Sequence, residues 1–168
     1  MDTTKIITLT IIGIVSMAIS LTITQLILRK EKSKSESEGK IRLAYGILFF
    51  TWVVVFSLLN FKSLSILNEY IDTVFKTNEG NSMIAILKTS VIFIGLTNVW
   101  MIVWYFITKV FTVLFAGNRN EANEIENNHY TLFLMKGILF IGFVYCLMPV
   151  FEILLRTFLP TIQTPFYH

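Results

Sequence analysis

Four long stretches without a charged side chain constrain this sequence more than any other feature. In chain order they cover residues 6–28, 43–61, 89–108 and 137–151. Each of the first three is close to the roughly 20 residues that a helix needs to cross about 30 Å of hydrocarbon. The fourth is shorter, but apolar residues flank it, and it reaches spanning length if Lys136 and Glu152 lie near the two membrane interfaces. We therefore expect four transmembrane helices.

The composition favours a membrane protein for the same reason. Of the 168 residues, 54% are hydrophobic and 15% are charged, whereas globular proteins carry about 25% charged residues. Strands of a membrane barrel would alternate apolar and polar residues over about ten positions, and these stretches do not alternate. The fold class that we expect is an all-α integral membrane protein, with four transmembrane helices in a small bundle.

The boundaries of the spans follow from the charged and polar residues between them. We expect spans at about 6–28, 43–61, 89–115 and 131–154, so that residues 1–168 form a single transmembrane domain. The first span is expected to be retained, because its uncharged core is longer than that of a signal peptide. Within the connection 62–88, apolar residues recur at helical spacing over about 62–76 and predict an amphipathic helical extension. The third helix should be long, with a start near Met83.

The distribution of Lys and Arg predicts the orientation. Six of the 14 lie in the loop 29–42, which places this basic loop in the cytoplasm by the positive-inside bias. The acidic loop 116–130 is then cytoplasmic too, whereas the connection 62–88 and both termini are extracytoplasmic. A bacterial cytoplasmic (inner) membrane is the expected location, because the chain is cysteine-poor and carries no eukaryotic sorting motif.

The two cytoplasmic loops carry opposite net charges, and we expect them to dock a soluble cytoplasmic protein. The first loop should be a flexible connector, because it has no apolar residue before Ile41. The second contains EANEIENN, which is polar nearly all round, so a helix there would need support from elsewhere. It is either a solvated acidic turn or a docking surface for a soluble partner, and we favour the docking surface. The candidate docking residues are Lys30, Lys32, Lys34, Arg119, Glu121, Glu124 and Glu126.

Polar residues inside the spans are the second set of candidates. One face of the first span carries small or hydroxylated side chains at i, i+3, i+7 and i+11, namely Gly13, Ser16, Ser20 and Thr24. Such a stripe favours close helix packing, and it could equally line a narrow water path. Asn98 lies midway along the third span, where an amide needs a partner, so we expect it to hydrogen-bond across a helix contact or a symmetry axis.

The end of the fourth span contains an unusual charged pair. Pro149 predicts a kink, and Glu152 and Arg156 follow at i, i+4 in the favourable acid-before-base order. We expect an ion pair near the outer interface. It either snorkels to water or acts as a conformational latch or the outer ring of a pore.

No pattern in the sequence predicts catalysis, a cofactor or a metal. The single cysteine, Cys146, and the two histidines, His129 and His168, lack metal-ligand spacing. Arg119 and His129 resemble a ribonuclease pair only loosely, because nothing in the sequence holds their geometry. We therefore expect no enzyme, no cofactor and no direct nucleic-acid partner.

Three functions remain, and the first is the preferred one. It is a non-enzymatic membrane subunit that homo-oligomerises and anchors, or signals to, a soluble cytoplasmic partner within a bacterial multi-gene system. In outline the layout is similar to small four-span subunits of phage-defence operons, such as the membrane component of Kiwa, although no motif carries this likeness. The alternatives are an oligomeric channel or holin-like pore subunit and a small-molecule transporter.

Overall fold

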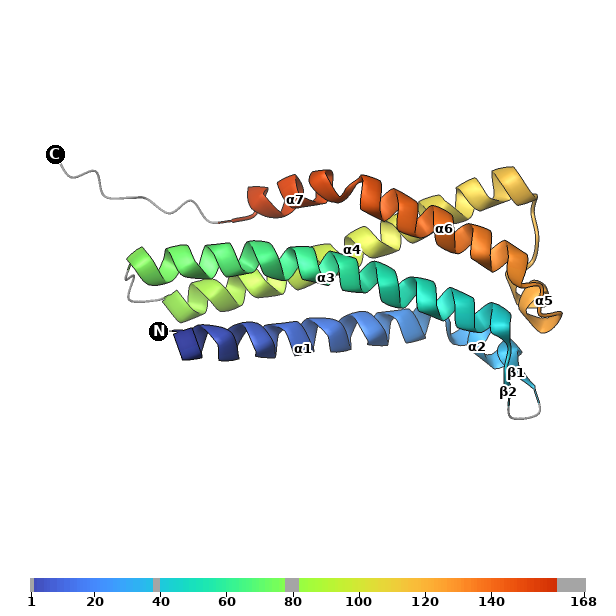
Figure 1. Cartoon of the computed structure of the whole chain (residues 1–168), viewed down its shortest axis with the longest axis horizontal. Helices are drawn as coiled ribbons and strands as arrows, with labels where there is room; N and C mark the ends of the chain where they lie inside the picture. Colours follow the sequence, from blue (N-terminus) through green and yellow to red (C-terminus); the bar gives the residue numbers. More distant parts are fainter. Residues whose placement is uncertain (1, 38–39, 78–81, 160–168) are drawn as a thin grey trace.

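The computed structural model describes residues 2–37, 40–77 and 82–159, and helices make up nearly all of them (Figure 1). Two short strands, β1 (Glu36–Ser37) and β2 (Lys40–Ile41), pair antiparallel. The helices are α1 (Asp2–Ile27), α2 (Arg29–Ser35), α3 (Leu43–Thr77), α4 (Ser82–Ala116), α5 (Glu121–Glu126), α6 (Tyr130–Cys146) and α7 (Met148–Thr157).

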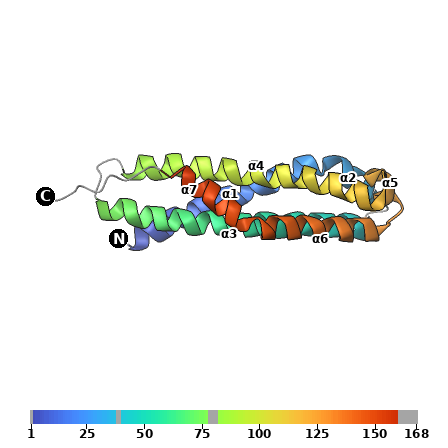
Figure 2. The ribbon, with the colours of Figure 1, turned by 90° about the horizontal axis from the view of Figure 1, so that it is seen from above.

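The long helices run along one axis in alternating directions. In Figure 1, α1 and α4 run one way, and α3 and the α6–α7 pair return. The start of α1 and the ends of α3 and α7 point to one end of the molecule, whereas α2, the two strands and α5 lie at the other. Helix α3 is central, because it contacts α1, α4, α6 and α7, and α4 and α6 also contact each other. Figure 2 shows α6 in the same layer as α3, with α4 beside them.

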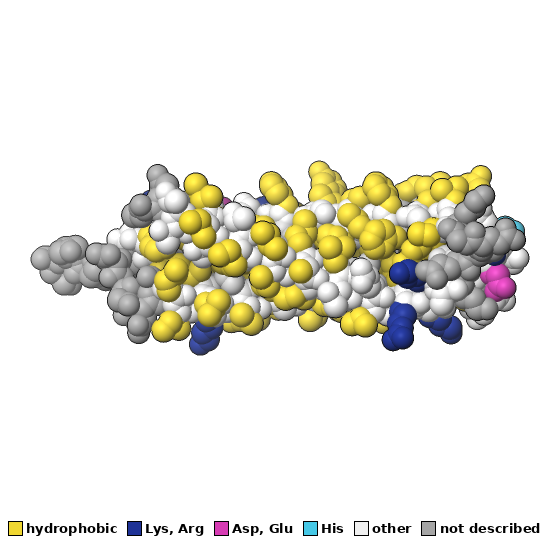
Figure 3. Space-filling model, turned by 90° about the horizontal axis from the view of Figure 1, so that it is seen from below, with side chains coloured by type: hydrophobic (Ala, Val, Ile, Leu, Met, Phe, Trp, Pro, Cys, Tyr) yellow, Lys and Arg dark blue, Asp and Glu magenta, His cyan; other side chains and the backbone are white. Residues whose placement is uncertain are grey.

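Three of the helices are long and apolar enough to cross a membrane, over Thr3–Ile27, Leu43–Lys76 and Met83–Ala116. Helices α6 and α7 pass the same test as a pair, and are bent by 50° at the break between them. Pro149 lies in the first turn of α7, where a proline does not disturb the helix that it begins. On the face shown in Figure 3, apolar side chains run along most of the length of the molecule, and the few charged side chains lie towards its two ends.

Helix α3 contains both the second predicted span and the predicted amphipathic extension. It continues without interruption to Thr77, because residues 61–76 hold no proline or glycine and keep one apolar face towards the bundle. On that face Ile66, Leu67, Tyr70, Ile71 and Val74 are all buried. The long third helix is also present, as α4.

Two predictions about the loops were wrong. The segment 29–42 was expected to be a flexible connector, yet it forms α2 and the β1–β2 pair. The segment 117–130 was expected to be a loop, yet it contains α5. Each short helix obtains support from the other, because α2 packs against α5. Ser35 and Ile125 are fully buried, so that a sequence too polar to fold alone is stabilised by tertiary contacts.

Candidate functional site

The connections at one end of the molecule fold together into a small unit. We call this unit the loop-side cap and define it as residues 29–37, 40–42 and 117–129. Asn120 begins α5, and its side-chain oxygen accepts a hydrogen bond from the backbone N–H of Ala122 at 3.1 Å, as expected of an N-cap residue. Arg42 donates to the carbonyl oxygen of Ile125 at 3.4 Å.

A second contact joins the loop-side cap to the start of α3. Asn128 adopts a left-handed backbone conformation, with φ of 54°, which asparagine tolerates better than most residues. Its side-chain oxygen accepts a hydrogen bond from the backbone N–H of Ala44 at 3.2 Å. This bond satisfies one of the amide groups that the first turn of a helix leaves unpaired.

A buried lysine links the loop-side cap to the interior of the bundle. Lys136 of α6 is 2% exposed, and its ammonium lies 2.8 Å from the Glu121 carboxylate of α5. It also donates to the hydroxyl oxygen of Tyr105 at 3.1 Å and lies 4.3 Å from the centroid of that ring. Lys109 approaches the other Glu121 oxygen at 3.8 Å. A charge this deeply buried is stable only when a counter-charge and hydrogen bonds compensate it, and this site supplies both.

Aromatic rings close the site on the bundle side. The ring of Tyr105 lies 4.7 Å from that of Trp52 and 5.8 Å from that of Phe140, between centroids. Trp52 and Phe140 are themselves 5.5 Å apart in an edge-to-face arrangement. These rings keep water away from the Lys136 ammonium on this side, so water cannot replace Glu121 as its partner there.

The sequence placed Lys136 near a membrane interface and Glu121 on a docking surface. In the structure these two residues pair with each other, with the side chain of Lys136 2% exposed and that of Glu121 16% exposed. The helical spacing of α5 is the cause, since Glu121 and Ile125 are four residues apart and therefore turn the same way, towards α6 and α3. A lysine alone within an apolar stretch was the sequence signal for such a site, but the sequence does not identify its partner.

Of the other predicted docking residues, Glu124 is partly buried, with 16% of its side chain exposed, whereas Arg119 is exposed. Glu124 contacts Arg119 at 3.5 Å and the Nδ1 atom of His129 at 3.0 Å, so the structure brings the loose Arg–His pair to one carboxylate. Both partners are more than half exposed. Lys30, Lys32 and Glu126 are also exposed, whereas the side chain of Lys34 lies outside the described residues.

The stripe on α1 packs against α3. Ser16 donates a hydrogen bond to the side-chain oxygen of Asn60, and the Asn60 amide donates to Ser20 at 3.2 Å. Thr24 is fully buried and donates to the carbonyl oxygen of Ser20. A Cβ atom added to Gly13 would lie 3.3 Å from Leu64. This placement favours helix packing over a water path, and it identifies Asn60 as a polar partner that the sequence interpretation missed.

Asn98 is also buried, but its bonding is incomplete. Its amide donates to the carbonyl oxygen of Ile94 on its own helix at 2.8 Å. Its side-chain oxygen has no hydrogen-bond partner within the described part of the chain. The expected bond across a helix contact is therefore not present among the residues that the structure describes.

A network of charges ties α7 to α3 at the other end of the molecule. Arg156 donates to Glu152 at 3.0 Å within α7, and each of them also has a partner on α3. The carboxylate of Glu152 lies 2.6 Å from Lys62, and Arg156 lies 2.9 Å from Glu69. The sequence predicted the i, i+4 pair, whereas the two partners on α3 became visible only in the fold.

No protein-family model, curated protein or solved structure matches this chain. Over residues 2–37, 40–77 and 82–159, no three His, Cys, Asp or Glu side chains gather in a group that could hold a metal ion. The polar features that stand out among the described residues are the exposed surface of the loop-side cap, the Lys136–Glu121 pair and the charge network at the other end of the molecule.

Proposed function

We propose that this chain is an integral membrane protein of a bacterial cytoplasmic membrane with four spans, the fourth formed by α6 and α7 together. The loop-side cap then lies in the cytoplasm, and both termini lie outside. Support comes from the cations of α2, which follow directly after α1, as the positive-inside bias requires. The end of α3 and the start of α4 lie at the same end of the molecule as the start of α1 (Figure 1).

The function that we propose is that of a non-enzymatic subunit, which docks a soluble cytoplasmic protein on the loop-side cap and couples it to the membrane bundle. The Lys136–Glu121 ion pair is the observation that carries this proposal. A partner that displaces α5 also withdraws the carboxylate of Glu121 from a buried ammonium, which is energetically costly. By the same linkage, a rearrangement of α4 or α6 changes the affinity of the loop-side cap for its partner.

The docking surface consists of the outward side chains of the loop-side cap. Lys30 and Arg119 supply positive charge there, and Glu126 supplies negative charge; all three are exposed. Because exposed ion pairs contribute only about 0–1 kcal/mol each, these charges select and orient the partner more than they hold it.

Self-association is the second part of the proposal. Helix α1 lies at the edge of the bundle, and only 11% of its apolar window is buried, against 50% for that of α3. Ala18 and Thr22 are exposed and four residues apart, a spacing of small residues that allows helices to approach closely in lipid. We infer that copies of the chain associate through this face.

Cross-linking of the tagged full chain in membranes, followed by mild-detergent purification, tests the docking role. We expect a stoichiometric soluble protein with the wild type and much less of it with Lys30→Glu. Lys88→Glu is the matched control, because Lys88 is an exposed lysine on α4 near the opposite end of the molecule. Recovery of the chain alone, with wild type and both variants, contradicts docking. Ion conductance of the purified wild type in a planar bilayer would then favour the pore alternative.

A further inference from the structure

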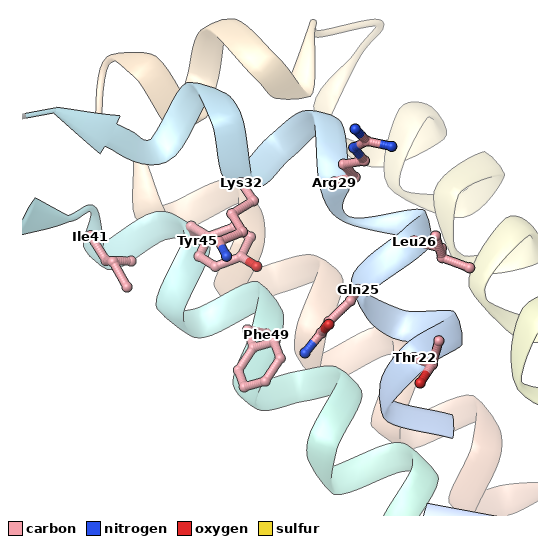
Figure 4. A pocket seen from close by; sticks show the side chains of 8 residues that line it. All are labelled: Thr22, Gln25, Leu26, Arg29, Lys32, Ile41, Tyr45 and Phe49. Carbon is pink, nitrogen blue, oxygen red and sulfur yellow. The ribbon is translucent and has the colours of Figure 1, made fainter. Parts of the chain in front are cut away.

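A groove with a volume of about 530 Å³ runs between the end of α1, α2 and the start of α3. One wall is formed by Gln25 and Leu26 at the end of α1 and by Arg29 and Lys32 of α2. Tyr45 and Phe49, four residues apart, form the opposite wall, and their rings stack at 6.3 Å. Figure 4 shows the Gln25 amide pointing into this groove and Lys32 reaching towards Tyr45.

The polarity of the groove changes along its length. The candidate membrane span of α1 ends at Ile27 and that of α3 begins at Leu43. Leu26 and Phe49 therefore lie on the hydrocarbon side of this boundary, whereas Arg29 and Lys32 lie just beyond it, within about 3–8 Å along the helix axis at 1.5 Å per residue. A tyrosine at this level is typical of the membrane interface. The groove is thus apolar on the hydrocarbon side of this boundary and cationic beyond it.

The two cations of the groove have no ion-pair partner among the side chains that the structure describes. Both are exposed, and none of these carboxylates pairs with either; the side chain of Glu36 lies outside the described part. Glu31, which lies between them in sequence, turns the other way and has a buried carboxylate oxygen. The groove therefore carries an excess positive charge at the depth where lipid phosphates lie.

We propose that this groove binds one acidic phospholipid. Its phosphodiester binds the Lys32 ammonium beside Tyr45, with Arg29 on the outer side of the same cationic rim, and one acyl chain follows Phe49 towards the membrane interior. The Gln25 amide, between these two levels, donates to an ester carbonyl oxygen of the glycerol backbone. A second copy of the chain fits less well at this end of the groove, because two such cationic rims would repel each other; the association face through Ala18 and Thr22 shares only Thr22 with the groove. The site needs α1 and α3 to cross a membrane, but it does not depend on a soluble partner.

Native mass spectrometry of the purified full chain tests the site with phosphatidylglycerol, phosphatidylcholine and inorganic phosphate as probes. We expect one phosphatidylglycerol per chain, retained in preference to phosphatidylcholine and not displaced by phosphate. Loss of two charges near the surface in Arg29→Gln/Lys32→Gln should weaken retention on the order of thirtyfold. Gln25→Trp, which fills the groove and keeps both charges, should also lose the lipid.

The control removes two other charges. Lys30→Gln/Lys88→Gln changes the net charge by the same amount but leaves the groove intact, so it should retain the lipid as the wild type does. Three outcomes would overturn the proposal. They are retention of phosphatidylglycerol by Arg29→Gln/Lys32→Gln equal to that of the wild type, retention of phosphatidylcholine equal to that of phosphatidylglycerol, and displacement of the lipid by inorganic phosphate. A shift from dimer to monomer in Gln25→Trp with unchanged lipid retention would overturn it in favour of a second copy. Loss of a soluble partner in Lys30→Glu with normal lipid binding separates this site from docking.

Discussion

The ammonium of Lys136 and the carboxylate of Glu121 lie 2.8 Å apart, although 15 positions separate them in the chain. Their exposure is unequal, since the side chain of Lys136 is 2% exposed and that of Glu121 is 16% exposed. Glu121 also has Lys109 at 3.8 Å, whereas Lys136 has no second carboxylate at ion-pair distance among the described residues. The buried charge of Lys136 therefore depends on this ion pair for compensation more than the charge of Glu121 does.

Removal of the Glu121 charge should destabilise the protein strongly. Glu121→Gln leaves the buried ammonium of Lys136 without its counter-charge, at a cost of about 3–5 kcal/mol. The measurement is the free energy of unfolding in mixed micelles, titrated with a denaturing detergent and followed by tryptophan fluorescence. Glu121→Gln/Lys136→Met should recover much of the loss, because neither charge is then stranded.

Lys109→Met is the matched control for this prediction. It removes a more exposed lysine from the same carboxylate, so its cost should be about 0–1 kcal/mol. A Glu121→Gln variant no less stable than Lys109→Met would show that the buried pair does not support the fold.

Close contact between α3 and α6 should make Gly137 intolerant of any side chain. A Cβ atom at this position would lie 2.5 Å from the hydroxyl oxygen of Thr51, so Gly137→Ala should cost about 1–3 kcal/mol through overpacking. The same unfolding titration measures it. In a Thr51→Ala background the clash is removed, and most of the cost should disappear.

Gly142→Ala provides the comparison on the same helix. A Cβ atom there meets nothing within 4 Å, so the change should be neutral, or stabilising by up to about 1 kcal/mol from helix propensity. If both alanine variants had equal stability, the Thr51 contact would not determine how closely the helices pack.

The sequence predicted the long helices because a helix that crosses the hydrocarbon of a membrane needs a minimum length and cannot expose charged side chains to the lipid. Helices α3 and α4 include the second and third predicted spans, and α3 also includes the predicted extension over 62–76. The fourth span was predicted as one helix over 131–154, with a kink at Pro149. The structure has two helices there, with the break at Leu147 and a bend of 50°.

The contacts across the bundle were beyond the reach of the sequence. Ser16 and Ser20 were recognised as a stripe, but Asn60, 44 and 40 positions away from them, was not recognised as their partner. Likewise α5 forms because Ile125 is buried against other elements, and its own composition gives no sign of this. Such pairings depend on tertiary packing. Helical periodicity shows only on which face of its helix each residue lies.

Asn60 should contribute to the α1–α3 contact through both serines. Asn60→Leu leaves the hydroxyls of Ser16 and Ser20 without this partner, and should cost about 1–2 kcal/mol. The triple variant Ser16→Ala/Ser20→Ala/Asn60→Leu should recover part of this, because all three polar groups are then removed together. The thermal unfolding midpoint in detergent provides the measurement.

Asn98→Leu is the matched change on α4. Its amide bonds only within its own helix in the described structure, so its loss should cost less than that of Asn60. If Asn98→Leu were the more damaging change, Asn98 would have a partner in another copy of the chain. The Asn98→Leu variant would then run on size-exclusion chromatography as a smaller species than the wild type.

Glu152 should control how firmly α7 is held against α3. Its carboxylate contacts Lys62 at 2.6 Å and Arg156 at 3.0 Å, so Glu152→Gln weakens both links. We expect several-fold faster hydrogen exchange in α7 and unchanged exchange in α6. Since these groups are partly exposed, high salt should produce a similar change in the wild type.

Asp72→Asn is the control, because Asp72 pairs with Lys5 of α1 at 2.5 Å and lies outside this network. Exchange in α7 that responds neither to Glu152→Gln nor to salt would mean that its apolar contacts alone hold it.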